Sequence, residues 1–249
     1  MNRHTTVNKS QIKHQREYFA KERKSIQKYE LMPWHEAYLK RMKKGFLDKD
    51  ITGKKLIDIG SGSGYVAIEM AKMGIEVIAC DITKEYLKFI GDYKKRFNLT
   101  NLKLVNCSAD KISLKDNSVD YVVANAILEH LVYEKKAIKE WKRILKPKGK
   151  IFLTVPIKYK YIWPFFLPLH IIYDKKIGHL RRYDLKTIKE KFGMKVEKVY
   201  YSGHLLKMLS LLTSLIYRSR KLDNYMEKID SKFSKTPWGA SNVIAILRN

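Results

Sequence analysis

Short apolar runs alternate with amphipathic segments through most of the chain. Buried strands are predicted where a run of about five apolar residues is bounded by polar or turn-forming residues. These runs lie at 55–59, 76–80, 103–107, 119–124, 151–155, 195–201 and 242–247. Helical spacing of apolar residues predicts helices between them, at 65–73, 83–97, 131–145 and 184–192. The alternation predicts an α/β fold with a doubly wound, mostly parallel, seven-stranded sheet, which binds ligands at the carboxyl ends of its strands.

The segments outside this alternation suggest how the chain is organised. Residues 1–53 are predicted to form an N-terminal helical cap, because bulky apolar residues recur with helical spacing over 13–46, with an interruption near Pro33. Residues 54–249 are predicted to form the domain that contains the sheet. An insertion is expected at about 202–240, since the last two strands are separated by far more residues than a hairpin needs.

The chain is strongly basic, with a formal net charge of +26 at pH 7 over 249 residues. Residues 56–130 are nearly neutral, so the excess lies in the two flanks. This asymmetry indicates an anionic partner, and RNA, anionic lipid and phosphorylated metabolites all qualify. A lysine-rich surface of the thermophile kind is the alternative explanation.

The sequence predicts no secretory signal and no membrane-spanning segment. Residues 1–30 are polar and lysine-rich, and no run reaches the ~18 apolar residues that a span requires. Cys80 and Cys107 have no metal-ligand spacing, so we expect two small buried thiols in a reducing compartment. We therefore expect a cytoplasmic protein.

A glycine-rich turn follows the first strand, in the sequence Asp58-Ile-Gly60-Ser61-Gly62-Ser-Gly64. Alternating glycines let the backbone turn tightly and approach a ligand closely, and the helix that follows offers free N–H groups to an anion. The same stretch satisfies a nicotinamide-dinucleotide pattern. Asp58 argues against that reading, because a carboxylate there suits an ammonium group and would repel the phosphates of a dinucleotide.

Further polar residues follow the next three predicted strands and should meet at the same edge of the sheet. Asp81 ends the second strand, where a carboxylate can accept hydrogen bonds from both hydroxyls of a ribose. Asp110 follows the third strand, where its carboxylate can accept from an adenine amino group. The segment from Asn125 to Leu131 follows the fourth strand and should line the floor of the same cleft.

Together these motifs resemble the class I S-adenosylmethionine-dependent methyltransferases, in particular the broad branch that includes the ubiquinone-biosynthesis type. The resemblance covers about 54–201 plus the last strand, and it implies S-adenosyl-L-methionine as cofactor and an antiparallel last strand. It implies a cofactor site in which Asp58, Gly60 and Gly62 bind the methionine end, Asp81 the ribose, Ile82 and Asp110 the adenine, and Asn125 the methionine or sulfonium region. Ser61, Ala109 and Lys111 belong to the same predicted site, with main-chain contacts as the simpler role for Ser61 and Lys111.

Methyl transfer requires alignment of the acceptor and, where the acceptor carries a proton, a base. His130, beside Glu129, and His179 are the candidate catalytic residues, each with a purely structural role as the alternative. Relatives in the ubiquinone branch bind a divalent metal with an additional acid upstream of the Glu-His pair. Asn125, Ala126 and Ile127 occupy those positions here, so we expect no metal.

The sequence predicts only the chemical class of the acceptor. Arg181, Arg182 and Tyr183 precede a helix where relatives face the acceptor, and paired arginines can bind phosphate or carboxylate. The apolar segments 161–173 and 205–217, the latter predicted as a helix, suggest a lipid-like acceptor or peripheral contact with the inner face of an anionic membrane. A buried pocket wall is the alternative for both segments. RNA methylation and a non-catalytic scaffold stay open as other functions, although nucleic acid is less favoured because no RNA-binding module is present.

Overall fold

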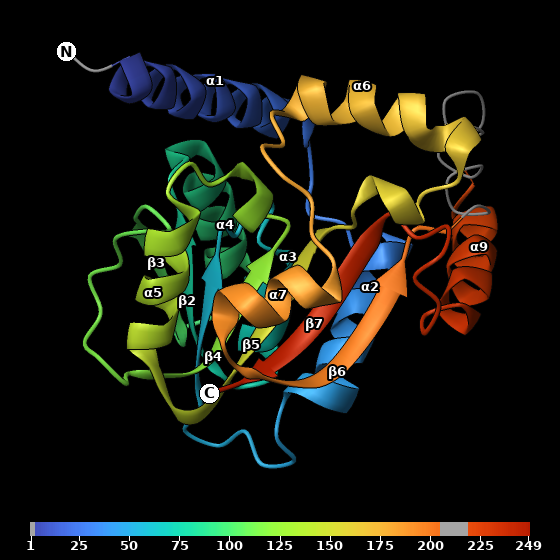
Figure 1. The fold of residues 1–249 in the computed structure, drawn as a ribbon. Helices are drawn as coiled ribbons and strands as arrows, with labels where there is room; N and C mark the ends of the chain where they lie inside the picture. Colours follow the sequence, from blue (N-terminus) through green and yellow to red (C-terminus); the bar gives the residue numbers. More distant parts are fainter. Residues whose placement is uncertain (1–2, 205–218) are drawn as a thin grey trace.

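Seven strands form one sheet, in the order β3-β2-β1-β4-β5-β7-β6 (Figure 1). The structure, a computed structural model, describes residues 3–204 and 219–249. The strands are β1 (Lys55–Ile59), β2 (Glu76–Asp81), β3 (Leu102–Asn106), β4 (Val119–Asn125), β5 (Leu145–Pro156), β6 (Lys195–Ser202) and β7 (Asn242–Arg248). β1 to β5 pair in parallel, whereas β7 runs antiparallel to both β5 and β6. The predicted sheet and its antiparallel last strand are confirmed.

Helices cover both faces of the sheet, as a doubly wound fold requires. One face is covered by α2 (Pro33–Arg41), α3 (Tyr65–Lys72) and α4 (Lys84–Arg96), and the other by α5 (Glu134–Ile144) and α7 (Leu185–Phe192). Phe46 and Ile68 are fully buried on the first face, and Trp141 and Ile188 on the second. This arrangement leaves the carboxyl ends of the strands free for the connecting loops that form a site.

The N-terminal region differs in detail from the predicted interrupted helix. α1 (Arg3–Ser25) lies over the loops that follow the strands, and a short π-helical turn (Met42–Phe46) extends α2. Pro33 begins α2 rather than interrupting it, because the first turn of a helix has no use for the missing N–H. The division of the chain at residue 53 stays a prediction.

The segment after β5 contains a helix that the sequence did not reveal. Two short 3-10 turns (Tyr159–Tyr161 and Pro164–Phe166) lead into α6 (Leu167–Ile177), which was expected only as an apolar stretch. Its two prolines precede α6 or lie in its first turn, where they are tolerated. β5 also begins earlier than predicted, at Leu145 rather than at residue 151.

The predicted insertion at 202–240 is described in part. It contains α9 (Arg220–Lys232), while the predicted helix at 205–217 lies outside the described residues. None of the helices in the described ranges combines the length and the apolar character needed to cross a bilayer.

Candidate active site

The turn between β1 and α3 has the geometry that only glycine adopts readily. Gly60, Gly62 and Gly64 have positive φ angles of 68°, 50° and 76°. A Cβ atom on Gly60 would lie 2.8 Å from Cδ1 of Ile127, and one on Gly64 would lie 2.5 Å from Cγ1 of Ile90. The glycines are therefore required by conformation and by close packing, and they leave the start of α3 open to a ligand.

Asp58 lies immediately beneath this turn and is only 2% exposed. The Ser61 hydroxyl donates a hydrogen bond to the Asp58 carbonyl (2.7 Å), which places the residue against the turn. Within the described residues, the carboxyl oxygen Oδ2 of Asp58 has no hydrogen-bond partner. Burial, reinforced by the nearby charge of Asp81, raises the pKa of Asp58 to about 7. A buried carboxyl group with an unpartnered oxygen and a raised pKa suits a cationic ligand, because a nearby positive charge would stabilise its ionised form.

Asp81 is held at the end of β2 by two backbone amides. The N–H of Gly62 donates to Oδ2 (2.9 Å) and the N–H of Thr83 donates to Oδ1 (2.8 Å). Burial raises the pKa of Asp81, although these hydrogen bonds oppose the shift. The carboxylate is thereby fixed toward the glycine turn, with lone pairs left for donors such as sugar hydroxyls.

One cavity of about 1080 Å³ joins these loops to the N-terminal helices. Nine of the predicted residues line it: Gly60, Ser61, Gly62, Asp81, Ile82, Ala109, Asp110, Asn125 and His130. Asp58 lies just behind the wall, and Lys111 is exposed outside it. The carboxyl of Asp110 accepts a hydrogen bond from the Ser108 hydroxyl. The lining of the cavity extends from the β1 turn to the loop after β3, and this span suits one nucleoside-type ligand.

Part of the cavity wall was not predicted from the sequence. Phe19 of α1 and His35 of α2 line the cavity, and the His35 ring stacks on Tyr65 with centroids 4.0 Å apart. The Tyr65 hydroxyl accepts a hydrogen bond from the Asn125 amide (2.8 Å). Gln15 of α1 donates to the His130 carbonyl (2.8 Å). The helical periodicity of 13–46 was the available signal, but it says nothing about which loops the helices cover.

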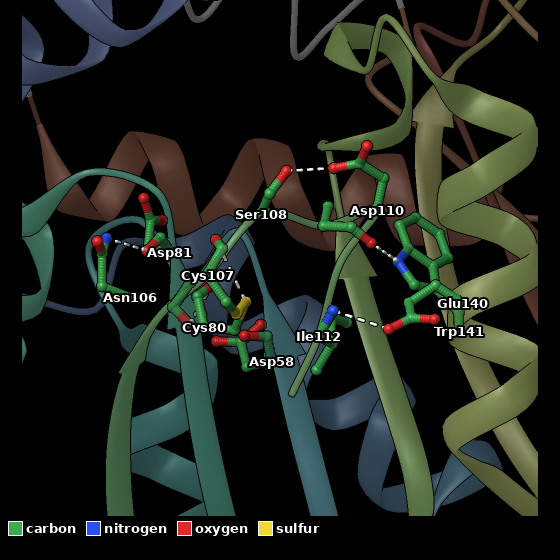
Figure 2. The surroundings of a disulfide bond; sticks show 12 residues. Asp58, Cys80, Asp81, Asn106, Cys107, Ser108, Asp110, Ile112, Glu140 and Trp141 are labelled. Atoms are coloured by element: carbon green, nitrogen blue, oxygen red, sulfur yellow. Dashed lines mark hydrogen bonds between the residues drawn. A yellow bond between two sulfur atoms is a disulfide. The ribbon is translucent and has the colours of Figure 1, made fainter. Parts of the chain in front are cut away.

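The two cysteines are joined by a disulfide beside the cavity, and the expectation of free thiols is wrong for this structure (Figure 2). The physical reason is the register of the sheet. Cys80 pairs with Val105, and Cys107 lies two residues further along the same side of the chain, so the cysteine Cα atoms are 5.8 Å apart. The bond connects the end of β2, which carries Asp81, to the loop that follows β3, which carries Asp110.

A second polar cluster lies beside the cavity and contains both catalytic candidates. Ligand-type atoms of Glu129, His130 and His179 lie within 4.8 Å of one another. Burial raises the pKa of Glu129 to about 8. Burial, together with the neighbouring His179, lowers the pKa of His130 to about 3. The donor types suit a transition metal, so the expectation of no metal stays a prediction that metal analysis can test.

His179 is oriented by an acid that the sequence analysis did not single out. Asp174 of α6 contacts the Nδ1 atom of His179 at 2.8 Å and accepts hydrogen bonds from Arg182 at 2.6 and 2.8 Å. The Tyr159 hydroxyl adds a fourth bond at 2.5 Å. Burial opposes ionisation of Asp174, but these hydrogen bonds hold its pKa below the usual value. His130 thus faces the large cavity, whereas His179 lines a second cavity of about 540 Å³.

The three predicted acceptor residues are engaged within the protein. Arg182 is bound to Asp174, as described above. Arg181 donates to the Leu131 carbonyl (2.5 Å), and the buried Tyr183 hydroxyl donates to Glu134 (2.8 Å). Both arginines line the second cavity rather than the large one. In the structure all three residues make contacts that hold the fold together, and their contact with the acceptor stays a prediction.

Comparison with known proteins gives consistent matches. Residues 57–153 match the family model described as the methyltransferase domain. The chain is 30% identical over 105 residues to the ubiquinone biosynthesis O-methyltransferase of Xanthomonas oryzae pv. oryzae, covering 42% of this chain and 44% of that protein. It is 36% identical over 104 residues to the ubiquinone/menaquinone biosynthesis C-methyltransferase of Rickettsia felis, covering 38% and 41%. Both matches span less than half of the relative.

A likeness of fold extends over more of the chain. The phosphoethanolamine N-methyltransferase 2 of Haemonchus contortus superposes with a TM-score of 0.61 at 19% identity, covering 87% of this chain and 52% of that one. The YcgJ protein of Bacillus subtilis superposes with a TM-score of 0.59 at 15% identity, covering 86% and 97%.

Proposed function

Because the chain is a class I S-adenosylmethionine-dependent methyltransferase, with S-adenosyl-L-methionine as methyl donor, we propose that it methylates an anionic or lipid-like small molecule. The observation that carries the methyl-donor part of the proposal is the pairing of two buried acids at one cavity. Asp58 has an unpartnered carboxyl oxygen, and Asp81 is fixed by backbone amides 23 residues further along the chain.

The residues present fit the donor. Asp58 would balance the ammonium group of its methionine part, directly or through water, and Asp81 would accept from the ribose hydroxyls. Ile82 and Ala109 line the cavity as apolar surfaces for the adenine ring, with Asp110 as acceptor for its amino group. When bound, the donor supplies a methyl group made electrophilic by a sulfonium.

The N-terminal helices support the proposal by covering the cavity. Phe19, His35 and other residues of α1 and α2 form part of the cavity wall. Gln15 fastens α1 to the core, since its amide donates to the carbonyls of His130 (2.8 Å) and Gly178 (3.2 Å). Excluding water in this way strengthens each electrostatic contact within the cavity.

His130 is the residue we assign to the acceptor. It is buried, lines the large cavity, and its Nδ1 atom has no hydrogen-bond partner within residues 3–204 and 219–249. A pKa of about 3 keeps the ring neutral but makes it a weak base. His130 would therefore accept a hydrogen bond and orient the acceptor, rather than remove a tightly held proton. This role favours acceptors whose reacting atom carries no proton at neutral pH, such as phosphate or carboxylate oxygens.

Calorimetry with S-adenosylhomocysteine tests cofactor binding. Wild-type protein should bind, Asp58→Asn and Asp81→Asn should bind more weakly, and the exposed Asp92→Asn should match wild type. If wild-type protein neither releases heat nor shifts its unfolding temperature at millimolar ligand, the scaffold function replaces the enzyme.

Transfer of a radiolabelled methyl group tests the acceptor class. Lipid extracts, anionic metabolite pools and RNA from the source cells are offered in parallel, and label is expected in the lipid or metabolite fraction. Label confined to RNA would overturn the acceptor assignment while leaving the methyltransferase intact. His130→Ala should lower kcat, and His130→Asn should restore part of it because the amide oxygen can still accept a hydrogen bond.

A further inference from the structure

Helix α6 buries polar side chains and exposes apolar ones. Its protein-facing side contains His170 and Asp174 together with Ile177, each only 7% exposed. Its outward side contains Leu169 and Ile172, which are 42% and 64% exposed. Tyr173 faces the large cavity instead, and its ring centroid lies 6.1 Å from that of His179. A surface helix normally turns its apolar residues toward the core and its charged residues toward water. The outer face of α6 is therefore matched to an apolar environment.

The apolar outer face continues into the turn that precedes α6. Trp163 is 43% exposed and Phe165 is 62% exposed, and their rings stack with centroids 6.2 Å apart. Figure 1 shows α6 at the periphery of the molecule, on the same side as α1. Trp163, Phe165, Leu169 and Ile172 together form what we call the α6 patch. Contiguous exposed apolar side chains of this kind mark an interaction surface.

Two exposed lysines, Lys175 and Lys176, follow the α6 patch. Neither has an ion-pair partner in the part of the chain that the structure describes. Lys160, which precedes the patch, is also exposed but pairs with Asp184 at 3.1 Å. Between residues 157 and 182 Asp174 is the only acidic residue, and it is buried against Arg182. The patch therefore presents apolar side chains with uncompensated positive charge at its C-terminal end.

We propose that the α6 patch inserts into the head-group region of an anionic lipid bilayer. Apolar and aromatic side chains with flanking lysines are the composition of interfacial anchors, because the side chains enter the acyl boundary while the ammonium groups meet anionic head groups. This deepens the proposed function and rests on it, since a lipid-like acceptor would reach the enzyme at such a surface. RNA suits the patch poorly, because the patch offers no charge within its apolar area.

The second cavity gives the same surface a place for an anionic group. It is lined by Ile171 and Lys175 of α6 together with Lys158, Lys160 and Arg181. Among its described lining residues Asp174 is the one acid, and its carboxylate is already engaged by Arg182. Asp184 pairs with both Lys158 and Lys160 at 3.1 Å, so Lys175 is the lining lysine without an ion-pair partner among the described residues. A phosphate bound by Lys175 would lie beside the apolar patch, as the head group of a lipid does.

Vesicle co-sedimentation of the full chain tests the proposal. Wild-type protein should sediment with vesicles of equal parts phosphatidylglycerol and phosphatidylcholine, and much less with phosphatidylcholine alone or at high salt. The double variant Phe165→Ser plus Ile172→Ser should reduce the partition coefficient at least about tenfold. Lys175→Gln plus Lys176→Gln should weaken binding to the anionic vesicles only.

A matched pair of single variants separates the patch from general loss of apolar surface. Ile172 and Tyr225 are 64% and 62% exposed, so Ile172→Ser should weaken binding while Tyr225→Ser should not. Equal behaviour of the two variants would overturn the proposal. So would failure of wild-type protein to bind anionic vesicles, or a dimer of the chain that Ile172→Ser dissociates.

S-adenosylhomocysteine binding, measured on each variant, keeps the two proposals distinguishable. Variants that lose vesicle binding should retain cofactor binding, which also shows that they are folded. Intact cofactor binding without any vesicle binding would refute the lipid anchor alone. Loss of cofactor binding in the wild-type chain would refute the proposed function instead.

Discussion

Cofactor affinity is expected to fall as the pH drops through neutrality, because Asp58 must be ionised to attract a cation. Burial first, and the charge of Asp81 second, raise the pKa of Asp58 to about 7 in the free protein. Below that pH the carboxyl group is protonated and neutral. A ligand that brings an ammonium group must then displace the proton, and the displacement weakens binding.

The size of the effect follows from Coulomb's law. A unit charge about 5 Å from the carboxylate, at an effective dielectric constant of about 20, stabilises the ionised form by about 3 kcal/mol, or about 2 pKa units. The pKa of Asp58 should therefore fall from about 7 in the free protein to about 5 in the complex. Linkage then predicts about tenfold weaker binding near pH 6 than near pH 8, approaching about a hundredfold below pH 5.

Isothermal titration with S-adenosylhomocysteine measures both the affinity and the number of protons released on binding. Repeating each titration in two buffers of different ionisation heat should show release of most of one proton near about pH 6 and almost none near about pH 8. Asp58→Asn should bind weakly with a flat pH profile. Asp92→Asn, an exposed carboxylate on α4, should follow the wild-type curve.

Two results would refute this reasoning. A wild-type affinity that does not change between about pH 5 and pH 8 would mean that Asp58 does not sense the ligand charge. An equally steep slope in Asp58→Asn would mean that the proton belongs to another group, with Asp81 the first to examine because burial raises its pKa as well.

Three further predictions concern stability and affinity. Without ligand, Asp58→Asn should raise the free energy of unfolding by up to about 4 kcal/mol near pH 8 but not near pH 4. The pKa of the Asp58 carboxyl rises from 3.8 to about 7 on folding, so the wild-type protein loses stability as the pH increases between those values. Thermal unfolding at both pH values checks this, and equal shifts would contradict it. Asp81→Ala should weaken S-adenosylhomocysteine binding by about 1–3 kcal/mol, and an unaltered dissociation constant would remove the ribose assignment. Reduction of the Cys80–Cys107 disulfide should lower the free energy of unfolding by about 3–4 kcal/mol, since it opens a loop with a sequence separation of 27. Urea denaturation with and without dithiothreitol measures it, and Cys107→Ser should be insensitive to the reductant.

The sheet and the glycine turn were predictable because their signals are local. Continuous apolar runs identify buried parallel strands, and the rule that ligands bind at their carboxyl ends brings Asp58, Asp81, Asp110 and Asn125 to one edge without further information. The bounds of β1 agree with the prediction, and most other strands differ by one residue at an end. The residues of the glycine turn were recognisable because only glycine satisfies that backbone.

The features that were missed depend on contacts between distant segments. The disulfide requires the register of β2 against β3, which no residue spacing specifies. Arg182 looked free to bind an acceptor because its partner, Asp174, lies on a helix that the pattern did not reveal. That helix was hidden because its apolar residues lie on both sides, with Ile177 buried and Ile172 exposed, so no helical period stands out.

The two departures from ordinary folding rules lie on connected parts of the molecule. The unpartnered carboxyl of Asp58 and the exposed apolar side of α6 each lower the stability of the isolated chain. A cationic ligand would stabilise the first, and an apolar environment would stabilise the second. Gln15 bonds α1, which covers the cavity, to the carbonyl of Gly178 at the end of α6. A ligand in the cavity or a bilayer at the α6 patch therefore restrains both α1 and α6. Cofactor product and anionic vesicles should raise the unfolding temperature together by more than the sum of their separate effects, and Gln15→Ala should reduce the effect to that sum.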